Sequence, residues 1–416
     1  MNMMGFKRIK GKLCCEDVSL ETIAQKTGTP VYIYSRKTIL DNFHRLKQAL
    51  SSVEHEICYS VKVNSNLAVL NVLAEVGSGF DIVSGGELFR VIRAGGDPRK
   101  IVFAGVGKTS AEIKEAICCR IAFFTVESVS ELKRINNIAS EMGEKANIAI
   151  RVNPDVDSQT HKYITTGRME NKFGLDIESA YSAYLTAAKM PAVNPVAIQM
   201  HIGSQIIHTA PYRQAVERII PLIRRVQKAG IFLEVLDLGG GYGIVYNDEN
   251  PATAEEYANR LLPVVKELDM KIYIEPGRFI AGNAGVMLTR VQYIKENPVK
   301  RFVIVDAGMN DLVRPSLYNA YHGINAVDLR AGKDVLYDVV GPVCESGDFF
   351  AKDRLLSPLQ EGDLLAVMSA GAYGFVMCSN YNARPKPAEV LVSDGEFRIV
   401  RQRETYDDLI KGEMEI

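Results

Sequence analysis

Hydrophobic and polar positions alternate between two periods in a regular order from residue 36 onward. Apolar residues recur at helical spacing in eight segments, which we expect to be helices: 36–50, 66–76, 86–94, 110–119, 128–142, 178–189, 210–229 and 253–268. Short apolar runs lie between and after these segments, and we expect them to be strands: 56–61, 80–83, 101–103, 121–126, 147–152, 197–201, 234–238 and 272–275. Several helix starts carry residues suited to capping, namely Ser84 with Glu87, Ser110 before Glu112, and Ser128 with Glu131.

Eight helices alternating with eight strands predict a parallel sheet, and this number favours closure into a (β/α)8 barrel of the TIM type. An open doubly wound sheet is the alternative. Beyond residue 281 the pattern changes to strand-like runs separated by turns: 286–295, 301–306, 338–342, 363–368 and 388–392. Residues 1–35 add one short strand at 31–34. We therefore expect an α/β protein with a barrel domain at 36–280 and a mostly antiparallel, barrel-like β domain formed by 1–35 and 281–416.

Composition narrows the class of protein. The chain has 416 residues, and its 47% hydrophobic and 24% charged content is typical of a globular protein. Lys plus Arg (49) nearly equals Asp plus Glu (50), so no strong field favours nucleic acid or an anionic membrane. No apolar run suits a membrane span or a signal peptide. The seven cysteines form neither a CxxC metal motif nor a disulfide framework. We expect a cytoplasmic protein without a metal.

The ends of the predicted strands carry an unusual concentration of residues that can act in catalysis or ligand binding. In a barrel, the carboxyl ends of the strands gather the working side chains on one face. These ends carry Lys62, Asp81 with Ser84, Glu127, Arg151 with Asn153, His201 with Ser204, Gly239 to Gly241, and Glu275 with Arg278. A lysine that ends a buried strand has its ammonium partly desolvated, which favours the free amine as a nucleophile toward a carbonyl. By itself, Lys62 is better explained as a charged residue where a strand meets solvent.

Three further motifs give that lysine a specific meaning. The glycines of LDLGGGYG (236–243) allow backbone N–H groups to converge on one phosphate, whereas the spacing fits neither a dinucleotide fold nor a P-loop. His201 could stack on a flat ring, and Glu275 could keep a pyridine nitrogen protonated. Each motif alone has a purely structural explanation, as a tight turn, a core histidine or an ion pair with Arg278. Together they match the requirements of pyridoxal 5'-phosphate.

Six motifs resemble one family over essentially the whole chain. YSVKVNSN, DIVSGGEL, HIGSQ, LDLGGGYG, EPGR and GPVCESGDF are similar to the fold-type III pyridoxal-phosphate decarboxylases. The resemblance implies a β/α barrel followed by a β domain, in a homodimer whose active sites are shared between the subunits. It further implies that Lys62 carries the cofactor as a Schiff base, that His201 stacks on its ring and that Glu275 faces its nitrogen.

The same resemblance assigns the remaining cofactor and catalytic positions. The phosphate would be held by Ser204, Gly240, Gly241 and Tyr373 of GAYG, and the cofactor site would also include Asp81, Gly277 and Arg278. Cys344 and Glu345 of CESGD would be presented to the partner subunit's site. Cys344 would be a proton donor to the decarboxylated carbon.

Substrate choice in this family depends on the far end of the substrate. The resemblance is strongest to members that convert meso-2,6-diaminopimelate to L-lysine and CO2, the last step of lysine biosynthesis. Arg278, Arg314 and Tyr318, with Tyr373 nearby, would bind the distal carboxylate, because a bidentate arginine suits it. Glu345 would pair with the distal ammonium.

Several other functions remain open at this point. A decarboxylase of the same fold could act on ornithine, arginine or the carboxylated polyamine carboxynorspermidine. An amino-acid racemase is disfavoured by Glu275, since racemases tend to place an arginine at the pyridine nitrogen. A cofactor carrier or regulatory homologue is disfavoured by the second domain and by Lys62. Residues 161–167 and 171–174 are candidates for a loop that closes over the site.

Overall fold

The computed structural model describes residues 5–157 and 172–414 of the chain. Internal contacts divide the protein into two units. The first, called the barrel unit below, comprises Asn42–Ile244 and Asn250–Phe279. The second, called the β unit, comprises Met1–Asp41, Val245–Glu249 and Ile280–Ile416.

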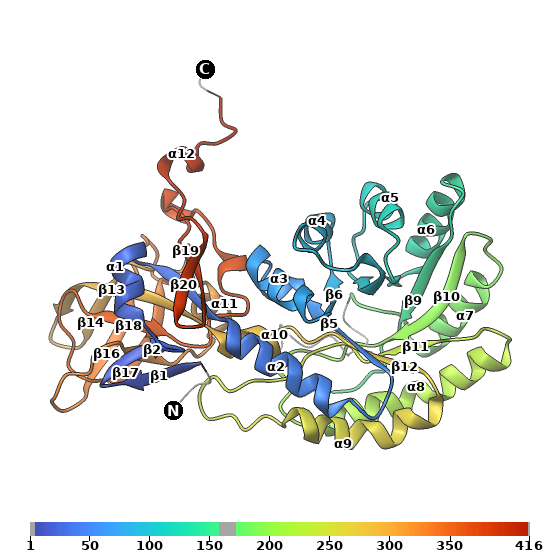
Figure 1. Cartoon of the computed structure of the whole chain (residues 1–416), viewed down its shortest axis with the longest axis horizontal. Coiled ribbons are helices and arrows are strands. Elements are labelled where there is room, and N and C mark those ends of the chain that lie inside the picture. The colour runs from blue at the N-terminus through green and yellow to red at the C-terminus, as the bar shows by residue number, and fades with distance from the viewer. Residues whose placement is uncertain (1–4, 158–171, 415–416) are drawn as a thin grey trace. The chain divides into compact units, whose positions relative to one another are not determined.

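Eight parallel strands of the barrel unit close on themselves in the order β10-β11-β12-β5-β6-β7-β8-β9 (Figure 1). The strands are β5 (His55–Ser60), β6 (Gly79–Ile82), β7 (Ile101–Phe103), β8 (Phe123–Val126), β9 (Ala146–Arg151), β10 (Val193–Gln199), β11 (Val235–Asp237) and β12 (Lys271–Ile274). The helices are α2 (Arg36–Ala49), α3 (Leu67–Glu75), α4 (Gly85–Arg93), α5 (Ser110–Cys119), α6 (Val129–Glu141), α7 (Ile177–Ala187), α8 (Ala210–Lys228) and α9 (Ala254–Val265). Closure confirms the predicted (β/α)8 barrel and excludes the open doubly wound sheet.

Two of the three predicted helix starts are correct. The side chains of Ser84 and Ser128 accept hydrogen bonds from the N–H groups of Glu87 and Glu131. The prediction for Ser110 is wrong, because Thr109 caps α5 in a reciprocal capping box with Glu112, and Ser110 is the first helical residue. A threonine hydroxyl accepts the same N–H bond as a serine, so the pattern alone could not choose between neighbours.

Strand β10 also differs from its predicted bounds. It begins at Val193, earlier than expected, and ends at Gln199, so His201 lies in the loop beyond the strand. Pro195 obscured the start, because a proline inside a strand pattern argues against a strand. The register of β10 against β9 shifts between Pro195 and Ala197, where the proline is accommodated.

The β unit is built around a mostly antiparallel sheet, as predicted, with the path β17-β16-β14-β13-β4-β19-β20 (Figure 1). Its strands are β1 (Phe6–Ile9), β2 (Lys12–Cys15), β3 (Val18–Ser19), β4 (Val31–Ser35), β13 (Gly285–Glu296), β14 (Arg301–Val305), β15 (Ile324–Ala326), β16 (Val335–Val340), β17 (Phe349–Leu356), β18 (Leu364–Val367), β19 (Ala388–Ser393) and β20 (Glu396–Arg401). Its helices are α1 (Leu20–Thr27), α11 (Arg314–Tyr318) and α12 (Tyr406–Leu409). The pairs β14–β16 and β4–β19 are parallel.

The first 35 residues contain more structure than the sequence indicated. Three short strands and α1 precede β4, which lies between β13 and β19 in the sheet. Phe6, Leu13 and Ile23 from this segment pack in one apolar core with Val286 and Val390. The N-terminal segment therefore completes the core of a unit that is otherwise formed by the last third of the chain.

In the described part of the chain, none of the helices combines the length and the apolar character that crossing a bilayer requires. Within those same residues, no three or more His, Cys, Asp and Glu side chains are grouped as metal ligands.

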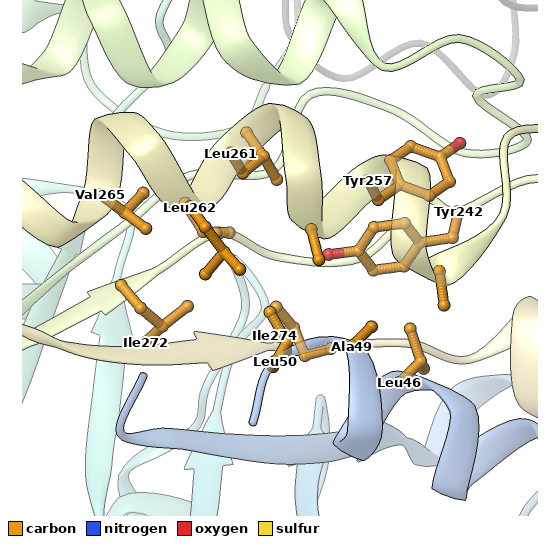
Figure 2. Close-up of a pocket in the computed structure, with 13 residues that line it drawn as sticks. Leu46, Ala49, Leu50, Tyr242, Tyr257, Leu261, Leu262, Val265, Ile272 and Ile274 are labelled. Atoms are coloured by element: carbon orange, nitrogen blue, oxygen red, sulfur yellow. The ribbon is translucent and has the colours of Figure 1, made fainter. Parts of the chain in front are cut away.

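Helix α9 packs over the barrel at strand β12 (Figure 2). Leu261, Leu262 and Val265 face Ile272 and Ile274, and residues of α2 close the far side. A cavity of about 20 Å³ lies between these side chains. Because its walls are apolar and its volume is near that of one water, we expect it to be dry.

Shortening one wall of this cavity should destabilise the barrel. Leu261 is 3% exposed, so Leu261→Ala should lower the free energy of unfolding by about 2–5 kcal/mol, the range for a buried leucine that leaves a cavity. The matched control is Leu329→Ala at a leucine that is 59% exposed, where the change should stay within about 0.5 kcal/mol. Urea denaturation followed by circular dichroism measures both; equal effects would contradict the packing described.

Candidate active site

Lys62 lies just beyond β5, in a single 3-10 turn formed by Val61–Val63. Its ammonium forms an ion pair with Asp81, whose side chain is fully buried at β6. The hydroxyl of Ser60 lies 2.8 Å from Asp81 Oδ2 and 2.9 Å from the carbonyl oxygen of Glu275. The closed sheet thus places the amine of Lys62, the carboxylate of Asp81 and the backbone of Glu275 together, as the strand ends predicted.

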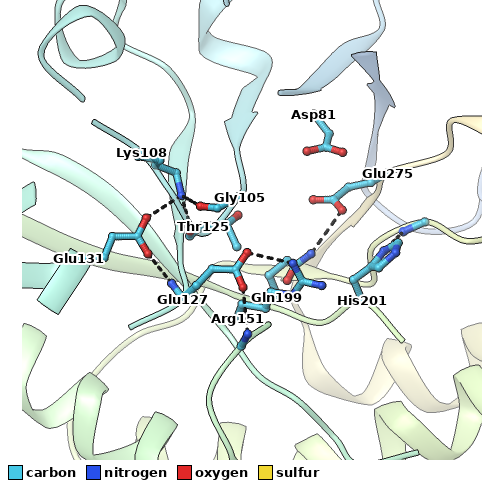
Figure 3. Close-up of polar contacts among 12 residues, drawn as sticks. Asp81, Gly105, Lys108, Thr125, Glu127, Glu131, Arg151, Gln199, His201 and Glu275 are labelled. Atoms are coloured by element: carbon cyan, nitrogen blue, oxygen red, sulfur yellow. Dashed lines mark hydrogen bonds and ion pairs between the residues drawn. The ribbon is translucent and has the colours of Figure 1, made fainter. Parts of the chain in front are cut away.

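Glu275 lies in a cluster of buried carboxyl groups (Figure 3). Gln199 Nε2 donates to Glu275 Oε2 at 3.3 Å, and Asp237 Oδ1 accepts from the N–H of Gly239 at 2.9 Å. Burial, reinforced by the charges of Asp237 and Asp81, raises the pKa of Glu275 well above its ordinary value. Burial likewise raises the pKa of Asp237 to about 7. Glu275 Oε1, Asp237 Oδ2 and Asp81 Oδ1 are buried, and among the described residues no N–H or hydroxyl group donates to them, while the carboxyl groups of Asp237 and Glu275 interact with each other.

These orphaned oxygens fit the cofactor that the sequence suggested. A buried acceptor without a donor is unfavourable, and a protonated ring nitrogen would supply both the donor and a compensating positive charge. Asp237 was not predicted as a site residue. The signal was available, because it ends β11 in the same motif as the glycines.

The glycine turn after β11 requires glycine for steric reasons. A Cβ on Gly240 would collide with the carbonyl oxygen of Glu275, and one on Gly241 with that of Gly203. Gly241 also has φ +99°, a conformation that favours glycine. The turn can therefore bring backbone N–H groups close to an anion in a way that larger residues could not.

His201 is oriented by the same turn. Its Nδ1 accepts a hydrogen bond from the N–H of Gly240 at 3.2 Å. Burial, together with the cations Arg151 and Lys62, lowers the pKa of His201 well below its ordinary value. The ring is therefore neutral at physiological pH and available to stack on a flat cofactor.

Gly277, Arg278 and Ser204 adjoin these groups. Arg278, which begins α10 (Arg278–Ala281), donates from Nη2 to Ser204 Oγ at 3.1 Å. A Cβ on Gly277 would press against Val63 and Ser60, so the EPGR motif packs directly on the turn that carries Lys62. The structure thus brings together the nine predicted site residues of the barrel unit: Lys62, Asp81, His201, Ser204, Gly240, Gly241, Glu275, Gly277 and Arg278.

A buried ion network crosses the loops after β7, β8 and β9 (Figure 3). Lys108 Nζ donates to Glu131 at 2.7 Å and to two backbone carbonyls at 2.8 Å, and burial lowers the pKa of Lys108. Arg151 donates to Glu127 Oε1 at 2.9 Å, and Glu131 accepts from the N–H of Glu127 at 2.7 Å. Sequence analysis assigned no role to Lys108. The structure shows that it joins the loop after β7 to strand β8 and to the first turn of α6.

The proposed closing loop lies mostly beyond what the structure describes. Residues 161–167 and residue 171 are outside the described residues. At the described end of this segment, the N–H of Gly174 donates to Glu127 Oε2 at 2.9 Å. The guanidinium of Arg151 lies 4.8 Å from the ring centroid of Phe173.

In the β unit, α11 is joined to the loop that carries CESGD. Ser316 Oγ donates to the carbonyl oxygen of Gly347 at 2.5 Å. The carboxylate of Asp348 shapes the loop by accepting the N–H groups of Met309 and Val343, each at 2.6 Å. Cys344 and Glu345 are exposed on this loop. The structure therefore brings the helix of Arg314 and Tyr318 next to the loop of Cys344 and Glu345.

Two residues of the β unit that the sequence did not suggest contact Arg314. Its Nη1 lies 2.9 Å from His322 Nε2, and its guanidinium lies 4.9 Å from the ring centroid of Tyr246. No sequence signal links them, since Tyr246 comes from the middle of the barrel sequence. Tyr373, the remaining predicted residue, follows β18 and has φ +56°, a strained conformation for a tyrosine that is common at functional sites.

Titration of Asp237 should show in the pH dependence of stability. Because its pKa is raised to about 7 from about 3.9, the folded protein keeps a proton that the unfolded chain releases. This contribution is full below about pH 4 and is lost as the pH rises through about 7. In cofactor-free Asp237→Asn, the free energy of unfolding should therefore fall less steeply between about pH 5 and about pH 8. Urea titrations at each pH test this, with the exposed Asp248→Asn as control; slopes equal to wild type would contradict it.

Comparisons with known proteins identify the family of this chain. A family model described as "Pyridoxal-dependent decarboxylase, pyridoxal binding domain" matches residues 36–282. The chain is 50% identical over 400 residues to the diaminopimelate decarboxylase of Vibrio cholerae, covering 96% of each chain. It is also 50% identical over 402 residues to that of Pseudomonas aeruginosa, covering 97% of each. The crystal structure of diaminopimelate decarboxylase from Helicobacter pylori complexed with L-lysine superposes with a TM-score of 0.91 at 43% identity, covering 94% of this chain and 98% of that one. The chain therefore belongs to the diaminopimelate decarboxylases, within the pyridoxal-dependent decarboxylase family.

Proposed function

We propose that the protein decarboxylates meso-2,6-diaminopimelate to L-lysine and CO2, the last step of lysine biosynthesis, with pyridoxal 5'-phosphate as cofactor. The observation that carries this proposal is the cluster of Lys62, Asp81 and Glu275 at the carboxyl ends of the barrel strands. Buried carboxylate oxygens in this cluster lack N–H or hydroxyl donors among the described residues. The relatives that share half of its residues are diaminopimelate decarboxylases. Ornithine, arginine and carboxynorspermidine are therefore not favoured as substrates.

The residues of the barrel unit suit each part of this cofactor. When bound, pyridoxal phosphate supplies the electron sink for the electron pair left by the departing carboxylate. Lys62 offers the amine that attaches it, and Asp81 holds that amine in place. Glu275 would accept a hydrogen bond from the protonated ring nitrogen and keep it protonated, and the neutral ring of His201 would stack on the cofactor. The phosphate is bound by the glycine turn at Gly240 and Gly241, by Ser204 and by Tyr373, with Gly277 and Arg278 adjoining.

The substrate's second amino-acid head requires both a cation and an anion. Arg314 and Tyr318, with Arg278 and Tyr373, bind the distal carboxylate, and Glu345 pairs with the distal ammonium. Release of CO2 leaves an electron pair on the α-carbon, and a proton from the Cys344 thiol takes the place of the lost carboxylate. Water then returns a proton to the sulfur, so each turnover consumes one proton overall.

A homodimer accounts for surface features of both units. Large apolar side chains are exposed on the segments that follow strands β5 to β8, with Phe89 at 65% and Val106 at 43%. Burial of these side chains between two subunits would favour a dimer. Cys344 and Glu345 are exposed on their loop, as residues offered to the partner subunit's site would be. We also place the enzyme in the cytoplasm, because all seven cysteines are free thiols.

Replacing Lys62 tests the reaction and its cofactor together. Lys62→Ala should lose at least about 10³-fold in kcat, because no other amine can take its role. The control Lys228→Ala removes an exposed lysine at the end of α8 and should keep wild-type activity. CO2 release is measured with meso-diaminopimelate, L-ornithine, L-arginine and L-lysine in parallel. Near-normal turnover by Lys62→Ala, or wild-type CO2 release from another of these substrates in preference, would contradict the proposal.

Mixing two inactive variants tests whether the sites are shared. Lys62→Ala and Cys344→Ala homodimers should each be nearly inactive. After dissociation and reassociation, half of the dimers should be mixed, each with one intact site, so activity should return to about a quarter of wild type. Sedimentation confirms reassociation, and Lys62→Ala mixed with itself is the control. If mixing restores nothing although mixed dimers form, Cys344 does not serve the partner subunit's site.

A further inference from the structure

His322 is held in one protonation state and one tautomer by the nature of its two neighbours. Its Nδ1 lies 2.8 Å from the carbonyl oxygen of Met368, and its Nε2 lies 2.9 Å from Arg314 Nη1. A carbonyl oxygen can only accept a hydrogen bond, so Nδ1 must carry the proton. A guanidinium can only donate, so Nε2 must present its lone pair. The buried ring is therefore neutral, with its proton on Nδ1.

The backbone around His322 is fixed on both sides. The N–H of Met368 donates to the carbonyl oxygen of Gly323 at 2.8 Å, where β15 begins to pair with β18. Arg354 Nη1 donates to the carbonyl oxygen of His322 at 2.9 Å, and its guanidinium lies 4.1 Å from the ring centroid of Tyr321. These bonds hold the backbone of His322 in place, and with it the position of the Nε2 atom that accepts from Arg314.

Tyr246 contacts both His322 and Arg314. Its ring meets that of His322 edge-on, with centroids 5.4 Å apart and planes at 81°, and the guanidinium of Arg314 lies 4.9 Å from its centroid. The backbone of Tyr246 is itself held, since its N–H donates to Glu249 at 2.9 Å. Arg314 is thus supported by a ring edge and by a ring face of two different aromatic residues.

The two contacts of Arg314 with His322 and Tyr246 are with uncharged side chains. The buried cations Lys108 and Arg151, by contrast, each pair with a carboxylate. A carboxylate partner would compete with a substrate carboxylate for the same guanidinium. His322 and Tyr246 are uncharged, so these two contacts orient Arg314 without competing with a substrate carboxylate for its guanidinium.

We infer that His322, together with Tyr246, is a positioning residue that aims Arg314 at the distal carboxylate of the substrate and so sets the preference for amino acids with a second acidic head. The inference rests on the proposed role of Arg314 in substrate binding. It assigns to His322 a part in specificity and none in the proton transfers of the reaction. Removing its acceptor should therefore weaken substrate binding and leave the chemical step nearly unchanged.

Two substitutions of His322 separate its hydrogen bond with Arg314 from its hydrogen bond with the Met368 carbonyl. His322→Asn keeps a donor for the Met368 carbonyl but loses the acceptor for Arg314. His322→Gln places an amide oxygen near the Nε2 position and keeps that acceptor. With holoenzyme, we expect His322→Asn to raise KM for meso-diaminopimelate about tenfold or more with kcat changed less than about threefold, and His322→Gln to lie closer to wild type.

Product inhibition supplies the matched comparison of ligands. L-Lysine keeps the distal carboxylate, because decarboxylation of the meso compound to an L product removes the other one, whereas cadaverine lacks it. Inhibition by L-lysine should weaken about tenfold in His322→Asn, and inhibition by cadaverine should change little. Equal weakening for both ligands, or a fall in kcat at unchanged KM, would overturn the inference.

The tautomer gives a test that does not depend on turnover. In wild-type protein with 15N-labelled histidine, the ring signals of His322, assigned by their loss in His322→Gln, should show a protonated Nδ1 and an unprotonated Nε2. An imidazolium or the opposite tautomer would overturn the inference, even if His322→Asn failed to fold. If the wild-type enzyme instead released no CO2 from meso-diaminopimelate, the proposed function would fail, and the tautomer would still report on the geometry.

Discussion

Closure of the barrel between β12 and β5 is the constraint on which the site depends. These strands come from opposite ends of the barrel sequence, and their pairing aligns Ile274 with Ile57. The same seam continues beyond the sheet, where the N–H of Ser60 donates to the carbonyl oxygen of Pro276 at 3.2 Å. Lys62 and Glu275 become neighbours only through this pairing. An open sheet with the same elements would leave the amine and the carboxylate on opposite edges.

The barrel unit contains two clusters of buried charged groups. Their hydrogen bonding indicates which cluster has a structural role and which one has a chemical role. In the Lys108 network, a buried ammonium has three acceptors and its carboxylate partner also accepts a backbone N–H, so the charges are well compensated. In the cluster around Glu275, several carboxylate oxygens are buried without donors among the described residues. Such a cluster costs folding free energy unless a ligand supplies protons and positive charge. We interpret the first as an anchor for the loops and the second as a site prepared for a cationic ring.

The β unit uses a third arrangement, in which a buried cation is oriented by neutral groups. Arg314 gains direction from the lone pair of His322 and from the face of Tyr246. A neutral contact does not compete with an acidic ligand for the guanidinium, whereas the ion pair of Arg151 is suited to holding the protein together. The two arginines are equally buried, so burial alone does not separate their roles; their partners do.

Much of the fold and of the candidate site could be predicted from the sequence, because the sequence patterns that indicate them are local. The period of apolar residues located all eight barrel strands and helices, and the strand ends located the side chains of the barrel site. Local signals failed where neighbours are chemically equivalent, as with Ser110 and Thr109, and where the pattern is broken, as at Pro195. They also failed for β17, whose charged stretch Lys352 to Arg354 hides the alternation.

Taken alone, the sequence determined the order of elements and the barrel, since each follows from residue types at short spacing. Its motifs, with the family resemblance that they carry, predicted the residues that would hold pyridoxal phosphate. Only the tertiary structure decided which buried groups are satisfied and which are not. The cluster of buried carboxyl groups at Asp237 and Glu275 depends on strand pairing across the barrel, and the contacts of Arg314 with neutral groups depend on Tyr246 and His322, which are far from each other along the chain. Contacts of this kind arise from packing in three dimensions, and no local pattern of amino acids encodes them.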